Sequence, residues 1–308
     1  MILKRCLLAL ALSTTVFAHP QQPAAGSPPG PDAGLPTYKP TNSFPWKNMY
    51  PVPRAVPQPK PEWMELLKNA TIANAPVVKK APDGSLVNPN PPGQDPYCAW
   101  SFTGCKRPDD IFTCQKGHWA LTYDDGPTLA SPPLYDVLDK MPEKVTFFVI
   151  GGQVIQYPEM LQRIYKAGHE IGIHTWSHNL LTSQTTEQIV AELKWTELAI
   201  KEVIGVAPRF MRPPYGDMDD RVRGIVKQLG FIPVIWNHDT FDWKINTPGF
   251  DASSIEAAAR QWAGNASTAA EGGISLQHDQ SQQTVDMAIK VLPIIKVCFS
   301  SLRNLCET

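Results

Sequence analysis

Short apolar runs of strand type alternate with longer runs of helical periodicity from Cys98 to the end of this 308-residue chain. Strand and helix repeated in this order predict an α/β fold, in which a mainly parallel sheet has helices packed outside it. Thr185 and Gln188 have the spacing of a capping box, and Gly168 and Gly230 follow predicted helix ends. Strands are expected at residues 119–123, 145–150, 170–174, 209–212, 231–237 and 273–277, and helices at 133–140, 158–167, 186–203, 220–229, 255–262 and 285–297.

Polar residues gather at the points where these predicted strands end. A barrel brings all of its strand ends to one rim, whereas an open sheet gathers only those beside its switch point. The pattern therefore favours a barrel. The residues concerned follow five different strands: Asp124 and Asp125, His174 and His178, Arg212 and Tyr215, Asp239 and Asp242, and His278 and Asp279.

The N-terminal third of the chain has a different composition. In residues 1–18 a positively charged start precedes a short apolar stretch, and Ala18 ends an acceptable cleavage site, as in a secretory signal peptide. Residues 19–95 hold more than half of the chain's 31 prolines. They predict a Pro-rich linker, extended and largely disordered, with one short helix at 62–69. Residues 96–308 form the expected folded domain.

Secretion makes disulfide bonds the default interpretation of the cysteines. Five remain once the signal peptide is removed, so at most two bridges form within the chain and one thiol is left over. The sequence does not fix the pairing, and a bridge between the first three and the last two would join the ends of the domain. The five are Cys98, Cys105, Cys114, Cys298 and Cys306.

The net charge of −1 lacks the basic excess that binding to nucleic acid or to an anionic membrane surface requires. No stretch after the signal peptide is long and apolar enough to span a bilayer. No hydrophobic tail of the GPI type follows Cys306, so no anchor is expected. Asn69 and Asn265 are candidate N-glycosylation acceptors in Asn-x-Ser/Thr sites.

Two adjacent carboxylates, Asp124 and Asp125, come where a buried strand opens into Gly-Pro. Adjacent anions repel each other, so such a pair needs a cation or a shared proton. His174 and His178 are spaced as zinc ligands but lack the glutamate of His-Glu-x-x-His, so a zinc protease is excluded. Two histidines and one of the aspartates predict a catalytic zinc site, with the other aspartate as base. Taken alone, the two aspartates could belong to an ordinary turn, and the two histidines could lie together in a polar loop by chance.

Five motifs in order resemble those of the polysaccharide deacetylases, the NodB-like enzymes of carbohydrate esterase family 4. They are Asp-Asp-Gly-Pro, His-x-x-x-His, Arg-Pro-Pro-Tyr-Gly at 212–216, Asp-x-x-Asp-Trp at 239–243 and Leu-x-His at 276–278. The resemblance covers roughly residues 117–297. The residues within the motifs are most similar to those of the secreted fungal chitin deacetylases. It implies a distorted (β/α) barrel of the TIM type. Tyr123 departs from the family pattern, where Phe is frequent, but an aromatic ring is kept.

The resemblance implies a separate role for each residue around the metal. Asp125 would join His174 and His178 as a ligand, and Asp124 would be the general base. Arg212 would pair with Asp124 and keep it ionised. The metal is expected to be zinc, although cobalt or another divalent ion suits the same ligands.

The later motifs imply the remaining roles. The backbone N–H of Tyr215 would face the oxyanion, and His278 would be the general acid, oriented by Asp239. Trp243 and Leu276 would form the walls of the pocket for the acetyl methyl group.

Other polar residues near these motifs receive plainer interpretations. His118 and His169 are interpreted as surface or structural residues. His238 should point away from Asp239 on its strand, and Asp242 is interpreted as either a loop residue or a substrate contact.

The leading hypothesis is a secreted metal-dependent N-deacetylase of chitin or its oligomers, located outside the cell or in the cell wall. A metal lowers the pKa of its water, a carboxylate takes the proton, and an imidazole protonates the leaving amine. The alternatives are an enzyme for another acetylated polysaccharide, such as xylan or peptidoglycan, and an inactive carbohydrate-binding wall protein. A purely structural wall protein is a further alternative. The motifs leave open the chain length of the substrate, the deacetylation pattern and the oligomeric state.

Overall fold

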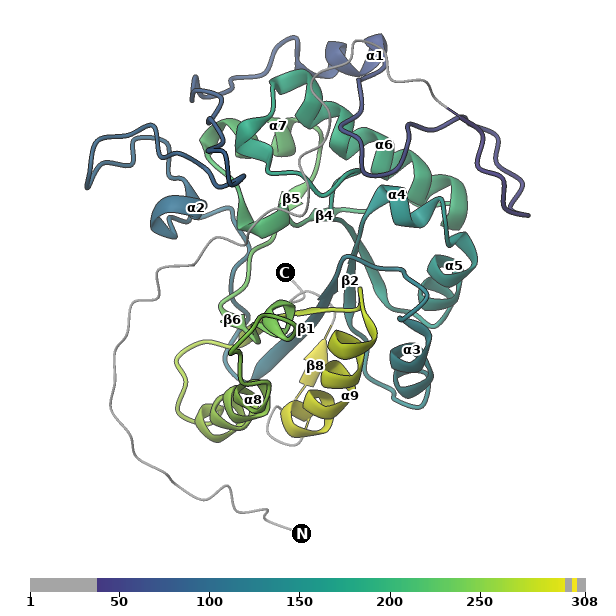
Figure 1. Cartoon of the computed structure of the whole chain (residues 1–308), viewed down its shortest axis with the longest axis vertical. Helices are drawn as coiled ribbons and strands as arrows, with labels where there is room; N and C mark the ends of the chain where they lie inside the picture. Colours follow the sequence, from purple (N-terminus) through teal and green to yellow (C-terminus); the bar gives the residue numbers. More distant parts are fainter. Residues whose placement is uncertain (1–37, 297–300, 304–308) are drawn as a thin grey trace.

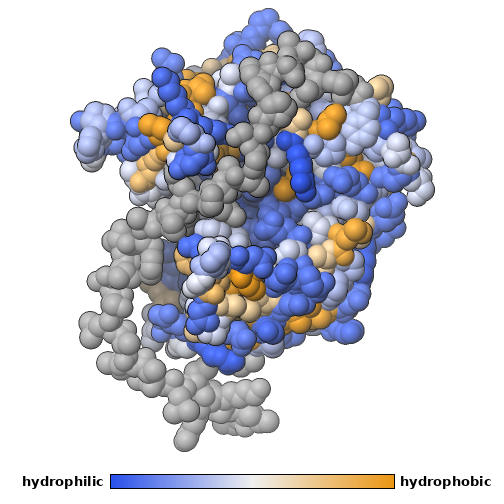
Figure 2. Space-filling model, viewed as in Figure 1, coloured by the Kyte–Doolittle hydropathy of each residue, from blue (hydrophilic) through white to orange (hydrophobic). Residues whose placement is uncertain are grey.

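The computed structural model describes residues 38–296 and 301–303. The predicted signal peptide and the cysteines at positions 298 and 306 lie outside these residues. Among the described residues, no helix combines the length and the apolar character needed to cross a bilayer. Figure 2 shows one face of the molecule, where hydrophilic residues predominate and hydrophobic residues form separate small groups.

The centre of the fold is a parallel sheet with strand order β5-β4-β3-β2-β1-β7-β6, to which β8 adds by pairing with β1 (Figure 1). The order and the parallel pairing confirm the α/β expectation. The strands are β1 (His118–Asp124), β2 (Thr146–Val149), β3 (Glu170–Ile173), β4 (Phe210–Met211), β5 (Ile232–Pro233), β6 (His238–Asp239), β7 (Gly273–His278) and β8 (Ser301–Arg303).

One extended stretch of chain supplies both edges of the sheet and curls it into a distorted barrel. Ile232 in β5 pairs with β4, whereas Asp239 in β6 pairs with Leu276 of β7. Residues 234–237 connect the two strands, and Val234 forms a bridge with Ile111. Within the strand predicted at 231–237 only Ile232–Pro233 is a strand, and β6 begins one residue after that range, on the opposite edge of the sheet. The barrel expectation is confirmed, because this closure brings the strand ends together.

Helices surround the sheet (Figure 1). The capping box predicted at Thr185 is present, and Gly168 and Gly230 both have φ of +87°, as helix-terminating glycines require. Two helices, α2 and α4, were not predicted. Each has only four residues, which is too short to show a helical pattern of apolar residues in the sequence. The helices are α1 (Pro61–Met64), α2 (Trp100–Thr103), α3 (Pro132–Leu138), α4 (Gly151–Val154), α5 (Pro158–Lys166), α6 (Thr186–Ile204), α7 (Asp220–Gln228), α8 (Ser253–Asn265) and α9 (Gln282–Lys296). The single-turn 3₁₀ helices are η1 (Glu65–Leu67), η2 (Leu181–Ser183), η3 (Pro214–Gly216) and η4 (Asp242–Lys244).

The prediction of a disordered linker is wrong for residues 38–95, here called the N-terminal segment. Apart from α1 and η1 it has almost no regular structure, but its aromatic side chains pack against the barrel domain. Trp46 and Tyr50 are 2% and 0% exposed. The hydroxyl of Tyr50 donates to the carboxylate of Glu202 on α6 at 2.6 Å, and Asn48 donates to the same carboxylate. Proline prevented a repeating hydrogen-bond pattern, but it did not prevent burial of aromatic rings.

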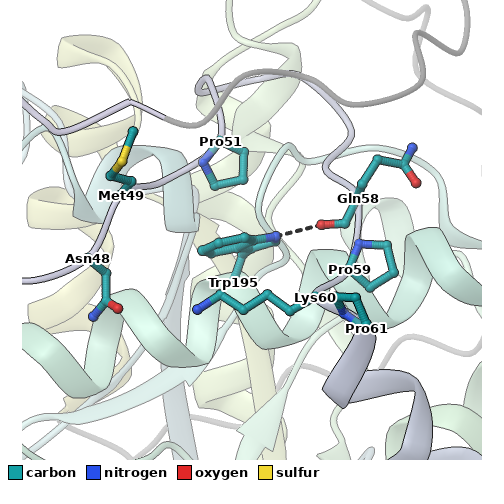
Figure 3. Close-up of a pocket in the computed structure, with 8 residues that line it drawn as sticks. All are labelled: Asn48, Met49, Pro51, Gln58, Pro59, Lys60, Pro61 and Trp195. Carbon is teal, nitrogen blue, oxygen red and sulfur yellow. Dashed lines mark hydrogen bonds between the residues drawn. The ribbon is translucent and has the colours of Figure 1, made fainter.

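A pocket of about 400 Å³ lies where the N-terminal segment crosses α6. Figure 3 shows the indole of Trp195, from α6, between residues 49–51 and residues 58–61 of the segment. The indole N–H donates to the carbonyl oxygen of Gln58 at 2.8 Å. Lys60 lies over the ring, with its Nζ 5.1 Å from the centroid. None of the residues that line this pocket belongs to the predicted catalytic motifs.

Cys98 and Cys105 form a disulfide bond, which locks the loop around α2. Cys114 is disulfide-bonded as well. A bridge between the first three cysteines and the last two stays a prediction, because Cys298 and Cys306 lie outside the described residues.

Candidate active site

Asp124 and Asp125 stand at the C-terminal end of β1, and their carboxylates point in different directions. Asp125 has φ of +78°, an uncommon conformation for a residue with a side chain, which turns it out of the strand. The next residue has to be glycine, because a Cβ at Gly126 would lie 2.3 Å from the carboxylate of Asp279. This turn lets two neighbouring aspartates meet different partners.

Asp125 meets the two histidines of the second motif. Its Oδ1 lies 3.1 Å from Nε2 of His178 and 3.4 Å from Nε2 of His174. One ligand atom from each of the three residues falls within 4.8 Å of the other two. Two imidazole nitrogens and one carboxylate oxygen are a donor set that zinc favours, with room for a fourth ligand.

Two observations test whether these residues fit a metal ion. The buried Oδ1 of Asp125 has no hydrogen-bond partner among the described residues, although it is aimed at two ring nitrogens. Nδ1 of His174 lies 2.8 Å from the carbonyl oxygen of Arg212, which only accepts. Nδ1 therefore carries the proton and Nε2 keeps its lone pair free for a metal. Both observations fit a divalent cation held by Asp125, His174 and His178.

The pKa of Asp125 lies well below the usual value for an aspartate. Burial alone would raise it, but the charge of His178 and the closeness of both imidazoles outweigh burial. The carboxylate is thus held in its ionised form, which is the form that binds a metal.

Residues 174–178 form a loop, here called the metal loop, that is held in place by hydrogen bonds to α6. Thr175 and His178 have φ of +63° and +61°, which are costly for residues with a Cβ. Glu192 of α6, which is fully buried, accepts hydrogen bonds from the backbone N–H groups of Trp176 and Ser177 at 2.7 and 2.8 Å, and from the Ser177 hydroxyl. Sequence reasoning missed Glu192, because a glutamate within a helix carries no motif signal.

Asp124 faces Arg212 instead of the metal cluster. Nη1 of the fully buried Arg212 donates to Oδ1 of Asp124 at 2.9 Å and to the hydroxyl of Thr122 at 2.5 Å. Its guanidinium lies over the ring of Phe148, 4.3 Å from the centroid. Oδ2 of Asp124 lies 3.8 Å from Nε2 of His174, so this carboxylate borders the metal cluster.

The partner of His278 is Asp242, and the expectation that Asp239 orients this imidazole is wrong. Nδ1 of His278 lies 2.7 Å from Oδ1 of Asp242, and the backbone N–H of His278 donates to Oδ2 at 2.8 Å. The η4 turn explains the difference. Phe241 has φ of +56°, and it swings the residue after it towards β7.

Burial alone would lower the pKa of His278. The negative charge of Asp242 and its hydrogen bond, followed by Asp125 and Asp124, instead raise it to about 10. His278 is therefore an imidazolium when no metal is bound.

Asp239 lies close to this pair but has other partners. Its Oδ1 accepts from the backbone N–H of Phe241 at 2.7 Å, and Trp243 donates to its carboxylate. Burial, together with the charge of Asp242, raises the pKa of Asp239 to about 6. Its negative charge is also felt by Arg212. Asp239 thus holds the η4 turn and the indole of Trp243 in place.

The remaining predicted site residues lie around these groups. Tyr215, in η3, has φ of +60°, and its ring packs 4.7 Å from that of His178. Leu276, in β7, is 4% exposed, and Trp243 is half-buried in η4. Asn69 and Asn265, the candidate glycosylation acceptors, are exposed.

Two other histidines are structural. Nδ1 of His169 accepts from the backbone N–H of Val145 at 3.2 Å, and the ring of His238 packs against Trp119 and Trp262. Burial lowers the pKa of both histidines to about 4.

Comparisons with known proteins agree with this arrangement. Residues 113–234 match the family model described as polysaccharide deacetylase. The chain is 47% identical over 207 residues to chitin deacetylase 1 of Cryptococcus neoformans, covering 63% of this chain and 44% of that one. The chain spans about half the length of the first curated relatives that it matches.

Solved structures with the same fold include deacetylases from a fungus and from a bacterium. The chitin deacetylase of Colletotrichum lindemuthianum superposes with a TM-score of 0.58 at 29% identity, covering 63% of this chain and 88% of that one. The peptidoglycan deacetylase PdaC of Bacillus subtilis gives 0.53 at 32% identity, covering 62% and 88%.

Proposed function

Because the chain belongs to the polysaccharide deacetylase family, we propose that it is a secreted, metal-dependent hydrolase that removes N-acetyl groups from chitin or its oligomers. The observation that carries this proposal is the meeting of three groups at the strand ends. They are the donor set of Asp125, His174 and His178, the Asp124–Arg212 ion pair, and the His278–Asp242 pair. A nucleophile, a base and an acid are the requirements of amide hydrolysis.

The metal would be held by Asp125, His174 and His178. When bound, it lowers the pKa of a coordinated water and polarises the acetyl carbonyl. Zinc is the proposed ion, because two imidazoles and one carboxylate suit it, and cobalt fits the same ligands.

Asp124 is the proposed general base. Arg212 pairs with Oδ1, so Oδ2 is the oxygen that accepts the proton of the attacking water. The new bond joins the water oxygen to the acetyl carbon. The backbone N–H of Tyr215 faces the negative charge that develops on the carbonyl oxygen, where a lost donor typically costs about 10²–10³ in rate.

His278 is the proposed general acid. Its Nδ1–H is engaged by Asp242, so Nε2 is the atom that donates a proton to the departing nitrogen. The C–N bond then breaks, and the products are acetate and a glucosamine unit. Trp243 and Leu276 line the space proposed for the acetyl methyl group.

The chitin substrate is favoured by the relatives named chitin deacetylase. Peptidoglycan is the second candidate, because the fold neighbour PdaC is a peptidoglycan deacetylase. An inactive binding protein is disfavoured, because the residues proposed as base, acid and metal ligands are all present. A location outside the cell or in the cell wall agrees with the signal-peptide pattern of residues 1–18 and with the disulfide bond.

Mass spectrometry of N-acetylglucosamine oligomers tests the proposal. The protein is incubated with the oligomers alone, with a chelator, and with the chelator followed by excess zinc. We expect stepwise loss of acetyl mass that the chelator abolishes and zinc restores. No loss from oligomers or colloidal chitin, together with loss from peptidoglycan or acetylated xylan, would reassign the substrate. No loss from any of them would favour the binding-protein alternative.

A further inference from the structure

The metal loop contacts the N-terminal segment at Trp176, midway between the two histidine ligands. The ring of Trp176 stacks on that of Tyr50 with centroids 5.8 Å apart and planes inclined by 8°. The indole N–H of Trp176 donates to the carbonyl oxygen of Val52 at 3.2 Å. Trp176 is fully buried by these contacts and by its neighbours in the barrel domain.

Tyr50 is itself fixed from two sides. Its hydroxyl donates to Glu202 at 2.6 Å, and its ring lies edge-on to that of Trp195, with centroids 6.0 Å apart. Asn48 and the backbone N–H of Lys47 donate to the same glutamate. Because Glu202 and Trp195 both belong to α6, this helix fixes the hydroxyl and the ring of Tyr50. Trp176 therefore packs against a side chain that is held in place.

The metal loop needs such support. Its left-handed residues, Thr175 and His178, have a backbone conformation that is unfavourable for residues with a Cβ. A strained conformation persists only where its surroundings over-determine it. Gly151 of the barrel domain also packs against the indole. The contact is so close that a Cβ at this position would lie 2.6 Å from Cε3 of Trp176.

We propose that the N-terminal segment is a working part of the metal site, in which Tyr50 and Val52 hold Trp176 and thereby set the positions of His174 and His178. Tyr50 is a positioning residue and touches neither metal nor substrate. The inference rests on the proposed metal site and goes beyond it, because it assigns a role to a Pro-rich stretch that lies outside every family motif.

The test is zinc affinity of the full chain, measured by competition with a chromophoric chelator. Outer-shell partners of metal ligands typically contribute about 10–100-fold in affinity. We expect Tyr50→Ala to weaken zinc binding by roughly tenfold or more within this range. Tyr50→Phe keeps the stacked ring and should restore most of the affinity.

Trp63→Ala is the matched control. Trp63 belongs to the same segment and packs edge-on against Trp195, with 4.9 Å between centroids. Among the described residues, none of its ring contacts is with the metal loop. Thermal unfolding of each metal-free variant measures the loss of general stability. The cobalt-substituted proteins give a second readout, since visible absorption of Co²⁺ reports the geometry of its ligands. Tyr50→Ala should alter that spectrum, and Trp63→Ala should leave it unchanged.

A Trp176→Ala background shows whether Tyr50 acts through the indole. Adding Tyr50→Ala to it should cost little further zinc affinity, because the partner is already gone. Equal weakening by Tyr50→Ala and Trp63→Ala at equal loss of stability would overturn the inference, as would wild-type zinc affinity in Tyr50→Ala. Failure of the wild-type protein to bind zinc would instead overturn the proposed metal site.

Discussion

Nδ1 of His278 and Oδ1 of Asp242 lie 2.7 Å apart, where β7 ends and η4 begins, and this pair is the proposed general acid with its partner. The carboxylate does two things at once. It accepts a hydrogen bond from Nδ1–H, which leaves Nε2 as the nitrogen for the proposed proton transfer, and its charge raises the pKa of the imidazole. Asp239, three residues earlier, accepts from Phe241 and Trp243 instead, and it interacts with His278 through its charge.

Replacing Asp242 should therefore change the alkaline side of the pH–rate profile. His278 acts as an acid while protonated, so activity is present below its pKa and falls as the pH rises through it. The pKa is about 10 without metal, and a cation near Asp125 lowers it by offsetting that negative charge. Asp242→Asn should move the alkaline limb of kcat to lower pH. Asp239→Asn is the matched control and should move the limb less, because Asp239 interacts with His278 through its charge alone. The reverse result would restore Asp239 as the partner.

His278→Ala should separate amide from ester substrates. A departing amine needs a proton, whereas a nitrophenolate leaves without one. General acid catalysis contributes roughly 10²–10⁴ in rate. We expect a loss of this size on N-acetylglucosamine oligomers and a much smaller loss on p-nitrophenyl acetate. Equal losses on the two substrates would argue against His278 as the acid.

Asp124→Asn should remove the base and keep the metal. The substitution preserves shape and a contact with Arg212, but an amide does not accept the proton from the attacking water. We expect kcat to fall by about 10²–10⁴, with one equivalent of zinc still bound by elemental analysis. Near wild-type turnover with zinc bound would mean that another group is the base.

Asp125→Ala should remove the metal. It deletes one of three ligands, so the loss of zinc affinity should exceed the roughly 10–100-fold typical of an outer-shell partner. Competition with a chromophoric chelator measures it, and Asp124→Asn serves as the charge-matched comparison. Unchanged zinc content in Asp125→Ala would show that the cluster is not the metal site.

Acid should destabilise the protein partly through His169. Burial, helped by the charge of Lys144, lowers its pKa from 6.5 to about 4. The unfolded chain binds this proton first, so the stability that is fully present above pH 6.5 is lost as the pH falls towards 4. The contribution is on the order of 3 kcal/mol. In urea unfolding with chelator at pH 7.5 and pH 4.5, His169→Gln should lose less stability than wild type, and equal losses would contradict this.

The sequence predicted which residues meet at the strand ends, because each motif lies where a buried strand meets a turn. Asp124 and Asp125 follow an apolar run that ends in Gly-Pro, and His174 follows another. Parallel strands bring such ends together, so the cluster of Asp125, His174 and His178 follows from topology. Family resemblance alone supplied the different roles of the two aspartates, and the left-handed turn at Asp125 supplies the physical reason.

Two features of the structure could not be predicted from the spacing of residues in the sequence. Asp239 and Asp242 are both plausible partners for His278, and the choice depends on the backbone of Phe241, whose positive φ has no sequence signal in a phenylalanine. The docking of the N-terminal segment also lacks periodicity. Its one available clue was the set of aromatic residues among the prolines, such as Trp46 and Tyr50, which a solvated linker has no reason to contain.

The contact between Tyr50 and Glu202 has a consequence for biosynthesis. A ribosome makes the chain from its N-terminus, so Tyr50 emerges long before the helix that receives it exists. During that interval the aromatic residues of the segment are exposed to neighbouring chains. Frequent prolines interrupt any pairing of such exposed stretches into β-aggregates. The same prolines that leave the finished segment without regular structure thus protect it until α6 has been translated.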